Sequence, residues 1–180
     1  MQNIIKDITR HICFRLVDID DAEFVLSLRL DMGKSRFISH VDKDVDAQKR
    51  WIADYKKREA ERTEYYYIIE NHAAERLGTI RLYDFQGDSF CWGSWVLKNG
   101  VPYYVAVESS LLAYEIGFYL LGFKKAHGDV RKGNDSVLDY HLRFGGIITR
   151  EDDLNYYLGY TKEKYELVKQ KYKRFFVADI

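Results

Sequence analysis

The hydrophobic positions of the chain recur with two spacings, one typical of strands and the other of helices. Short apolar runs bounded by turn residues predict strands at residues 12–17, 65–70, 77–85, 90–97, 124–130, 147–148 and 155–160. Helical spacing predicts a helix after the acidic turn at 18–21, and further helices at 42–62, 103–121, 134–144 and 162–176. This order predicts an α/β (α+β) fold in which helices cover the faces of a mixed sheet, and we expect one domain over residues 1–180.

The composition adds an unusual number of aromatic residues to this picture. The chain contains 15 Tyr, 10 Phe and 3 Trp, but a single Pro. Aromatic side chains with polar tips can form a core, and they also suit a cleft for polar ligands. The Tyr-rich C-terminal helix is a candidate interface for a homodimer.

Charge and cysteine content exclude several classes of protein. The 28 basic residues balance the 28 acidic ones, which argues against nucleic acid as a partner. No apolar run reaches the length of a membrane span, and the N-terminus lacks a signal-peptide core. Cys13 and Cys91 lie far apart, and no His or Cys pair has the spacing of a zinc site. We therefore expect a cytoplasmic protein without a metal or a membrane partner.

The segment from Asp129 to Gly146 carries the most informative pattern. The string Asp129-Val130-Arg131-Lys132-Gly133-Asn134 ends a predicted strand just before Asn134, and Gly145 follows eleven positions later. This segment resembles the late motif of the GNAT acyltransferases. In that family the Asn contacts the CoA arm, and a helical residue seven positions later faces the thioester sulfur.

The resemblance implies that His141 is the general acid for the leaving thiolate. Many relatives have Tyr at this position, and Tyr140 is the alternative acid if the helix is slightly rotated. An imidazole suits the role because its ordinary pKa lies near neutrality.

Two earlier strings narrow the resemblance. Gly78-Thr79-Ile80-Arg81-Leu82-Tyr83-Asp84 and Gly93-Ser94-Trp95-Val96-Leu97 are similar to strands of the GNAT branch that acetylates nucleotide-linked amino sugars. The family fold has a splayed strand pair with acyl-CoA in the gap, and the CoA pyrophosphate rests at the next helix N-terminus. The implied acetyl-CoA-binding residues are Trp95, Val96, Leu97, Tyr103, Tyr104, Ala106, Asn134 and His141.

One departure from the family pattern concerns the phosphate loop. The usual Arg/Gln-x-x-Gly-x-Gly/Ala string is missing between Leu97 and Ala106, where Tyr103 and Tyr104 stand instead. Tyrosine hydroxyls and the helix dipole could hold phosphate in its place. The missing loop also favours an alternative, a degenerate GNAT domain that binds ligand without catalysis.

The general base stays open at this stage. Asp84, His40 and Glu108 are candidates, either directly or through water. Cys91 stands where some relatives have a glutamate, and a covalent route through its thiol is disfavoured because an isolated buried Cys usually serves packing.

The acceptor pocket in this fold is formed by the first two helices and the central strands. The residues expected there are Arg29, Phe37, His40, Trp51, Arg81, Tyr83, Trp92 and Ser94. Arginines can pair with phosphate, and aromatic rings can stack on a sugar or base. The favoured function is therefore direct acetyl transfer from acetyl-CoA to the amine of a nucleotide-linked amino sugar, as in surface-polysaccharide biosynthesis. The enzymatic alternative is acetylation of a protein N-terminus or another small amine.

Overall fold

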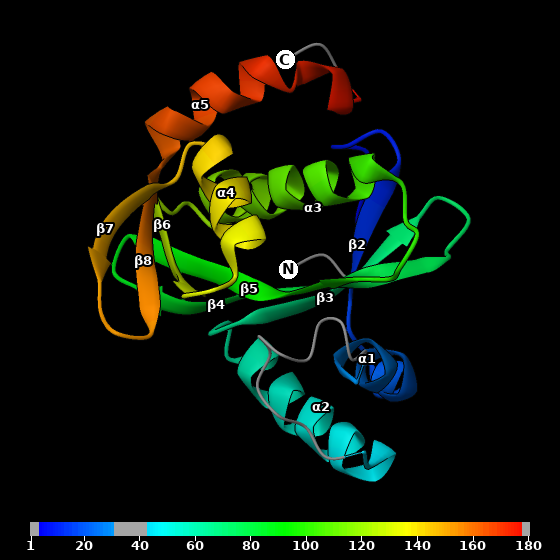
Figure 1. Cartoon of the computed structure of the whole chain (residues 1–180). Coiled ribbons are helices and arrows are strands. Elements are labelled where there is room, and N and C mark those ends of the chain that lie inside the picture. Colours follow the sequence, from blue (N-terminus) through cyan, green and yellow to red (C-terminus); the bar gives the residue numbers. More distant parts are fainter. Residues whose placement is uncertain (1–3, 31–42, 178–180) are drawn as a thin grey trace.

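The computed structural model describes residues 4–30 and 43–177, and its framework is an eight-stranded sheet (Figure 1). The strands, in the order in which they lie side by side, are β1 (Ile4–Ile5), β2 (Ile12–Leu16), β3 (Tyr65–Asn71), β4 (Arg76–Gln86), β5 (Ser89–Leu97), β6 (Lys125–Arg131), β8 (Asn155–Thr161) and β7 (Ile147–Glu151). Neighbouring strands run antiparallel except β5 and β6, which are parallel. The predicted mixed sheet is confirmed.

Helices lie on both sides of this sheet (Figure 1). On one side are α1 (Ala22–Arg29) and α2 (Val45–Ala60); on the other are α3 (Tyr103–Glu115), α4 (Asp135–Arg143) and α5 (Lys162–Lys171). The expected helix over 103–121 is an α-helix only as far as Glu115, and residues Ile116–Leu120 form a π-helical turn, η3. A Cβ on Gly117 would lie 2.0 Å from the Phe90 ring, so glycine is required where η3 meets β5.

The aromatic residues form much of the core. On the α3 side, Tyr114 packs against Phe118 and Tyr165, and all three are buried. On the α1–α2 side, Tyr55 and Tyr66 pack edge to face. Tyr165 of α5 thus serves the core of its own chain, so the tyrosines of that helix give no separate indication of a homodimer.

The parallel strands β5 and β6 separate along their length. They pair only from Ser89 to Cys91, opposite residues 125–127, and β5 has no β6 partner from Trp92 onward. A bulge in β5 accompanies the separation: Thr79 faces Val96 and Arg81 faces Gly93, so β5 has one residue more than β4 in this interval. The predicted splayed strand pair is confirmed.

Two local features hold this bulge. Ser94 adopts a positive φ of 48°, and the Thr79 hydroxyl donates a hydrogen bond to its carbonyl oxygen at 3.1 Å. Behind the bulge, a Cβ on Gly78 would lie 2.5 Å from the Val96 carbonyl oxygen, so only glycine fits there. The sequence of β4 therefore shapes the edge that β5 presents to the gap.

Candidate active site

A cavity of about 1080 Å³ occupies the gap between β5 and β6. It is lined by β5 from Cys91 onward, the loop 98–102, the first turn of α3, the end of β6 and the start of α4. A cavity of this size can enclose most of an extended ligand. The loss of strand pairing beyond Cys91 is therefore what creates the cleft.

The β5 wall contains three residues expected to bind acyl-CoA. Trp95, Val96 and Leu97 all line the cleft. The indole Nε1 of Trp95 donates a hydrogen bond to the Ser109 hydroxyl of α3 at 3.0 Å, which fixes the ring against the helix. Backbone groups on the edge of a diverging strand can pair with an amide-containing chain, in the manner of an added strand.

The N-terminus of α3 faces the same cleft. Pro102 is its N-cap and no side chain caps it, while Tyr103 and Ala106 line the cavity. Tyr104 lies outside the lining because its ring stacks on His11, with ring centroids 4.3 Å apart. We therefore withdraw Tyr104 from the residues expected to hold phosphate.

The loop 98–102 was missed as a binding element by the sequence reasoning. Lys98, Gly100 and Pro102 line the cleft where the family's glycine-rich loop would stand, and Gly100 has a positive φ of 76°. Lys98 also forms an ion pair with Glu75 at 3.6 Å. Arg131 lines the opposite wall at the end of β6. A lysine directly after a predicted strand was the signal available for this site.

His141 and Tyr140 are adjacent in α4, but only one of them lines the cleft. His141 lines the cleft and its ring lies 5.0 Å from that of Trp92. Tyr140 is outside the lining: its hydroxyl donates to the Ala106 carbonyl oxygen at 3.1 Å and lies 2.9 Å from the Ser110 hydroxyl. The geometry therefore favours His141 over Tyr140 as the group that meets the substrate thiol. Asn134, the N-cap of α4, also lines the cleft and makes no side-chain cap.

Burial changes the acid–base character of His141. Loss of solvent lowers its pKa from 6.5 to about 4, so the free enzyme contains a neutral ring at pH 7. The expectation of an imidazole that titrates near neutrality is corrected. A neutral ring still carries one N–H that can donate a hydrogen bond, and a thiolate forming beside it would raise the pKa again.

The acceptor side of the cleft contains two arginines. Arg29 at the end of α1 and Arg81 of β4 both line the cavity. The Arg81 guanidinium lies 4.1 Å from the centroid of the Tyr83 ring, and its buried Nε has no hydrogen-bond partner in the described ranges. Burial, and then the nearby Arg81 charge, lower the pKa of Arg29. Two partly desolvated cations facing one space form a site for an anion.

Only some of the other residues predicted for the acceptor pocket line the cleft. Tyr83, Trp92 and Ser94 line the cleft with the arginines. Trp51 does not, because its ring packs on Tyr55 and Tyr66 within the core between α2 and the sheet. Phe37 and His40 lie outside the described residues.

The candidate bases Asp84 and Glu108 have other partners. The Asp84 carboxylate lies 3.1 Å from His127 Nε2 and accepts from the Gln86 amide, outside the cleft lining. Glu108 is fully buried and accepts from the backbone N–H of His11 at 2.9 Å. We therefore no longer propose either as the base.

Cys91 lies in the cleft wall, but burial raises its pKa to about 11. At neutral pH the thiol keeps its proton and is a poor nucleophile. Direct transfer between the two substrates fits this site better than a covalent enzyme intermediate.

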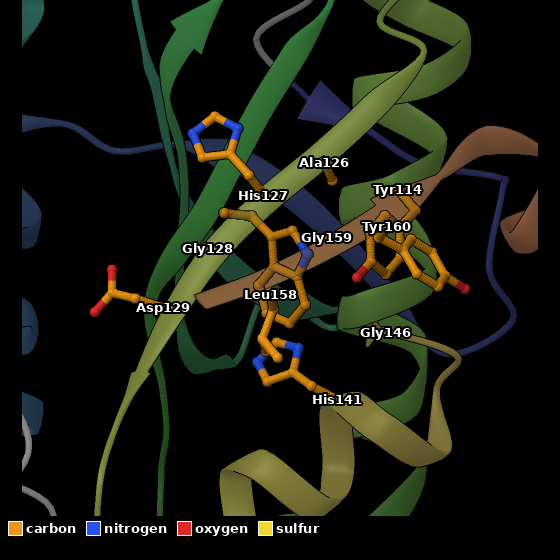
Figure 2. Close-up of a pocket in the computed structure, with 11 residues that line it drawn as sticks. Tyr114, Ala126, His127, Gly128, Asp129, His141, Gly146, Leu158, Gly159 and Tyr160 are labelled. Atoms are coloured by element: carbon orange, nitrogen blue, oxygen red, sulfur yellow. The ribbon is translucent and has the colours of Figure 1, made fainter. Parts of the chain in front are cut away.

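A small cavity of about 40 Å³ adjoins the cleft beside His141 (Figure 2). Trp92, His141 and Asp129 line both spaces. Asp129 was quoted in the sequence motif as the end of a strand, but it was not expected in the site. The alternation of side chains along β6 indicates which face of the sheet Asp129 occupies. The splay of β5 from β6 then leaves this residue in the cleft wall.

Comparison with known proteins decides the family. The profile of the acetyltransferase (GNAT) domain matches residues 11–146. The chain belongs to the GNAT acetyltransferase family. Among solved structures, this GNAT is similar to apo FdhC, described as a nucleotide-linked sugar GNAT, with 42% identity and a TM-score of 0.84. That match covers 95% of this chain and 98% of FdhC.

More distant GNAT structures share only the fold. Spermidine N-acetyltransferase from Vibrio cholerae, in complex with CoA and spermine, has 14% identity and a TM-score of 0.75 over 86% of this chain and 98% of its own. A GCN5-related N-acetyltransferase from Brucella melitensis has 11% identity and a TM-score of 0.78, covering 97% and 86%. The search of curated protein sequences finds no significant match.

As a GNAT, the chain is an acyl-CoA-dependent N-acetyltransferase, and its cleft fits acetyl-CoA. The unpaired edge of β5 suits the amides of the pantetheine arm, and the uncapped N-terminus of α3 suits a phosphate. Lys98 and Arg131 add positive charge on both walls. The cleft thus keeps the elements that an anionic thioester needs, although the family's usual phosphate loop is missing.

Metal-binding clusters and membrane-spanning helices are both absent from the described residues. Within residues 4–30 and 43–177, no cluster of three His, Cys, Asp or Glu side chains could hold a metal ion. Within the same ranges, no helix combines the length and the apolar character needed to cross a membrane.

Proposed function

We propose that this GNAT enzyme transfers an acetyl group directly from acetyl-CoA to the amine of a nucleotide-linked amino sugar. The observation that carries the proposal is the pair Arg29 and Arg81 in one wall of the cleft. Two arginines that have lost much of their water match a diphosphate, which offers charge and acceptor oxygens together. The similarity to FdhC, a nucleotide-linked sugar GNAT, supports the same substrate class.

The roles of the site residues follow from their positions. Arg29 and Arg81 bind the phosphates, while the Tyr83 ring beside Arg81 offers a flat surface to the sugar. Acetyl-CoA lies along β5, where backbone N–H groups near Trp95 and Val96 hold the thioester. The His141 N–H stabilises the sulfur as the thiol leaves. The product, an acylated nucleotide sugar, is a donor of the kind that builds surface polysaccharides.

The charge of the cleft separates this proposal from the small-amine alternative. Four cations line it, namely Arg29, Arg81, Lys98 and Arg131, against a single carboxylate among the described lining residues. A polyamine carries several positive charges and would be repelled by such a lining. The fold shared with a spermidine N-acetyltransferase therefore does not favour that substrate here.

A thiol-release assay tests the proposal. The panel contains acetyl-CoA with a nucleotide-linked amino sugar, the same free amino sugar, spermidine, and a peptide with a free N-terminus. We expect kcat/KM for the nucleotide-linked sugar to exceed that for the free sugar by about 100-fold, since phosphate contacts to two arginines are lost in the latter. Equal values for the two sugars, or release of CoA only with spermidine or peptide, would overturn the substrate assignment.

A further inference from the structure

The cleft contains one carboxylate among its described lining residues, that of Asp129 on β6. The last parallel pair of β5 and β6 is Cys91 opposite His127. Asp129 is two residues beyond this pair, so extension of the register places it opposite Gly93, across the gap where the strands diverge. It thus stands at the point where the cleft opens.

The Asp129 side chain extends to the acceptor face of the sheet. Ala126 belongs to the core beneath α3, and alternation along β6 turns His127 and Asp129 to the opposite face. Figure 2 shows these two side chains on one side of β6, with Tyr114 and Tyr160 on the other. Arg81 faces α2 through its contact with Trp51, so Asp129 and the arginines share the α1–α2 side.

The negative charge of Asp129 affects the pKa values of two neighbouring groups. Burial is the main cause that raises the pKa of the Cys91 thiol, and the negative charge of Asp129 raises it further. The same charge adds to the effect of burial on Tyr83. Asp129 therefore contributes to the electrostatic environment of the Tyr83 ring, over which the Arg81 guanidinium also lies.

Other carboxylates near the site are already engaged. Asp84 contacts His127, Glu108 contacts His11, and Glu64 accepts from Arg58 at 2.9 Å. In contrast, the Asp129 carboxylate has no hydrogen bond or ion pair within the part of the chain that the structure describes. Among the described lining residues, which include four cations, it is the one negative group that attracts an ammonium ion.

His141 does not fill this role. It belongs to α4, and its ring lies 5.0 Å from that of Trp92 and 6.2 Å from that of Tyr140. Its buried, neutral ring offers no negative charge to an incoming ammonium. Amine and thiol are thus served by different residues, one on β6 and the other on α4.

We propose that Asp129 binds the ammonium group of the acceptor and removes the proton that blocks its attack. One proton passes from R–NH₃⁺ to the carboxylate, directly or through one water. The free amine then forms a C–N bond with the thioester carbonyl carbon, the C–S bond breaks, and the second amine proton leaves with the sulfur as CoA-SH. Asp129 returns its proton to solvent. The inference rests on the proposed function only in requiring that the acceptor be an amine.

The first test is Asp129→Asn, which keeps the shape and removes the charge. We expect kcat/KM for the amine at pH 7 to fall by about 10² to 10³, the usual contribution of a general base. The Kd for acetyl-CoA should stay within about twofold, because the carboxylate is not part of the thioester wall. Asp129→Glu should recover part of the lost rate, and Asp153→Asn, on an exposed turn, serves as the matched control.

The pH profile separates a base from a merely structural residue. Without a protein base, only the neutral amine reacts, and below the amine's pKa its fraction rises about tenfold per pH unit. The D129N enzyme should show this slope between pH 6 and 8, whereas the wild type should be nearly flat. A D129N enzyme with the wild-type rate and profile would overturn the proposal.

Two further experiments distinguish failure of the variant to fold, or failure of the substrate proposal, from failure of the role proposed for Asp129. If the Asn variant does not fold, Asp129→Ala with added formate takes its place: saturable recovery of rate supports the base, and indifference to formate overturns it. The acceptor panel is run on the wild type first. Should the preferred amine carry no nucleotide, the substrate proposal fails while Asp129 is tested with the amine that does react.

Discussion

The two faces of the cleft differ in how they handle charge. One face carries formal charges, because Arg29 of α1, Arg81 of β4 and Asp129 of β6 all line the cleft there. The α4 face carries none among its nearest groups: His141 is neutral, and the rings beside it are those of Trp92 and Tyr140. An acceptor that arrives charged meets opposite charges, while the charge that develops on sulfur meets only a hydrogen-bond donor. On this difference rests our proposal that one face recognises the acceptor and the other serves the departure of the thiol.

After Asp129→Asn, the largest expected effect comes from breaking the charged face at Arg81. Arg81→Met keeps the length of the side chain and removes the guanidinium. Loss of a desolvated phosphate contact should raise KM for the nucleotide-linked substrate by about 100-fold, or about 3 kcal/mol, without changing the Kd for acetyl-CoA. Steady-state kinetics and calorimetry measure the two quantities.

The control for this experiment is Arg174→Met, an exposed residue near the C-terminal end. It should leave both constants unchanged. If Arg81→Met raised KM equally for the free amino sugar, the arginine would be supporting Tyr83 rather than binding phosphate.

The neutral face is tested by His141→Gln, which retains an N–H donor in a different geometry. We expect kcat to fall by about 30-fold, or about 2 kcal/mol, because the leaving sulfur loses its best-placed donor. The Kd for acetyl-CoA should change by less than about threefold. An unchanged kcat in a single-turnover measurement would transfer the role to water.

The depressed pKa of His141 predicts how stability depends on pH. The folded pKa of about 4 lies below the unfolded value of 6.5, so the unfolded state binds the proton more tightly. The contribution of His141 to the free energy of unfolding is full above pH 6.5 and is lost as the pH falls toward 4. Between pH 7.5 and 5, the free energy of unfolding should fall by about 2 kcal/mol more in the wild type than in His141→Gln. Urea denaturation at a series of pH values measures this difference, and parallel curves for the two proteins would contradict it.

The sequence predicted the sheet better than the site. The strands β3, β4 and β5 lie within a residue of their expected bounds, because continuous apolar runs are separated by turns at 72–75 and 87–88. The splay and the family followed from a motif resemblance. The end of α3 did not follow, since the π-helical turn depends on contact between Gly117 and the Phe90 ring.

The missed site residues share a physical reason. The alternation of side chains along β6 predicts the face on which Asp129 lies, but only the divergence of β5 leaves its carboxylate open to the cleft. One partner of Asp84 is also distant in sequence, since His127, which lies 43 positions later, contacts both Asp84 and Ser89. Local patterns report periodicity, whereas the availability of a carboxylate depends on which residues of other strands neutralise it.

The smallest expected effect distinguishes two adjacent residues of α4. Tyr140→Phe removes a hydroxyl that bonds to the Ala106 carbonyl and the Ser110 hydroxyl of α3, whereas the ring stays packed on Phe144. The free energy of unfolding should fall by about 1 kcal/mol, the usual net value of a buried hydrogen bond, with kcat unchanged. Thermal unfolding and the thiol-release assay give the two values. A fall in kcat as large as that expected for His141→Gln, without loss of stability, would return the acid role to Tyr140. The contrast between the two residues would then be reversed, since α4 would direct its tyrosine, and not its histidine, toward the sulfur.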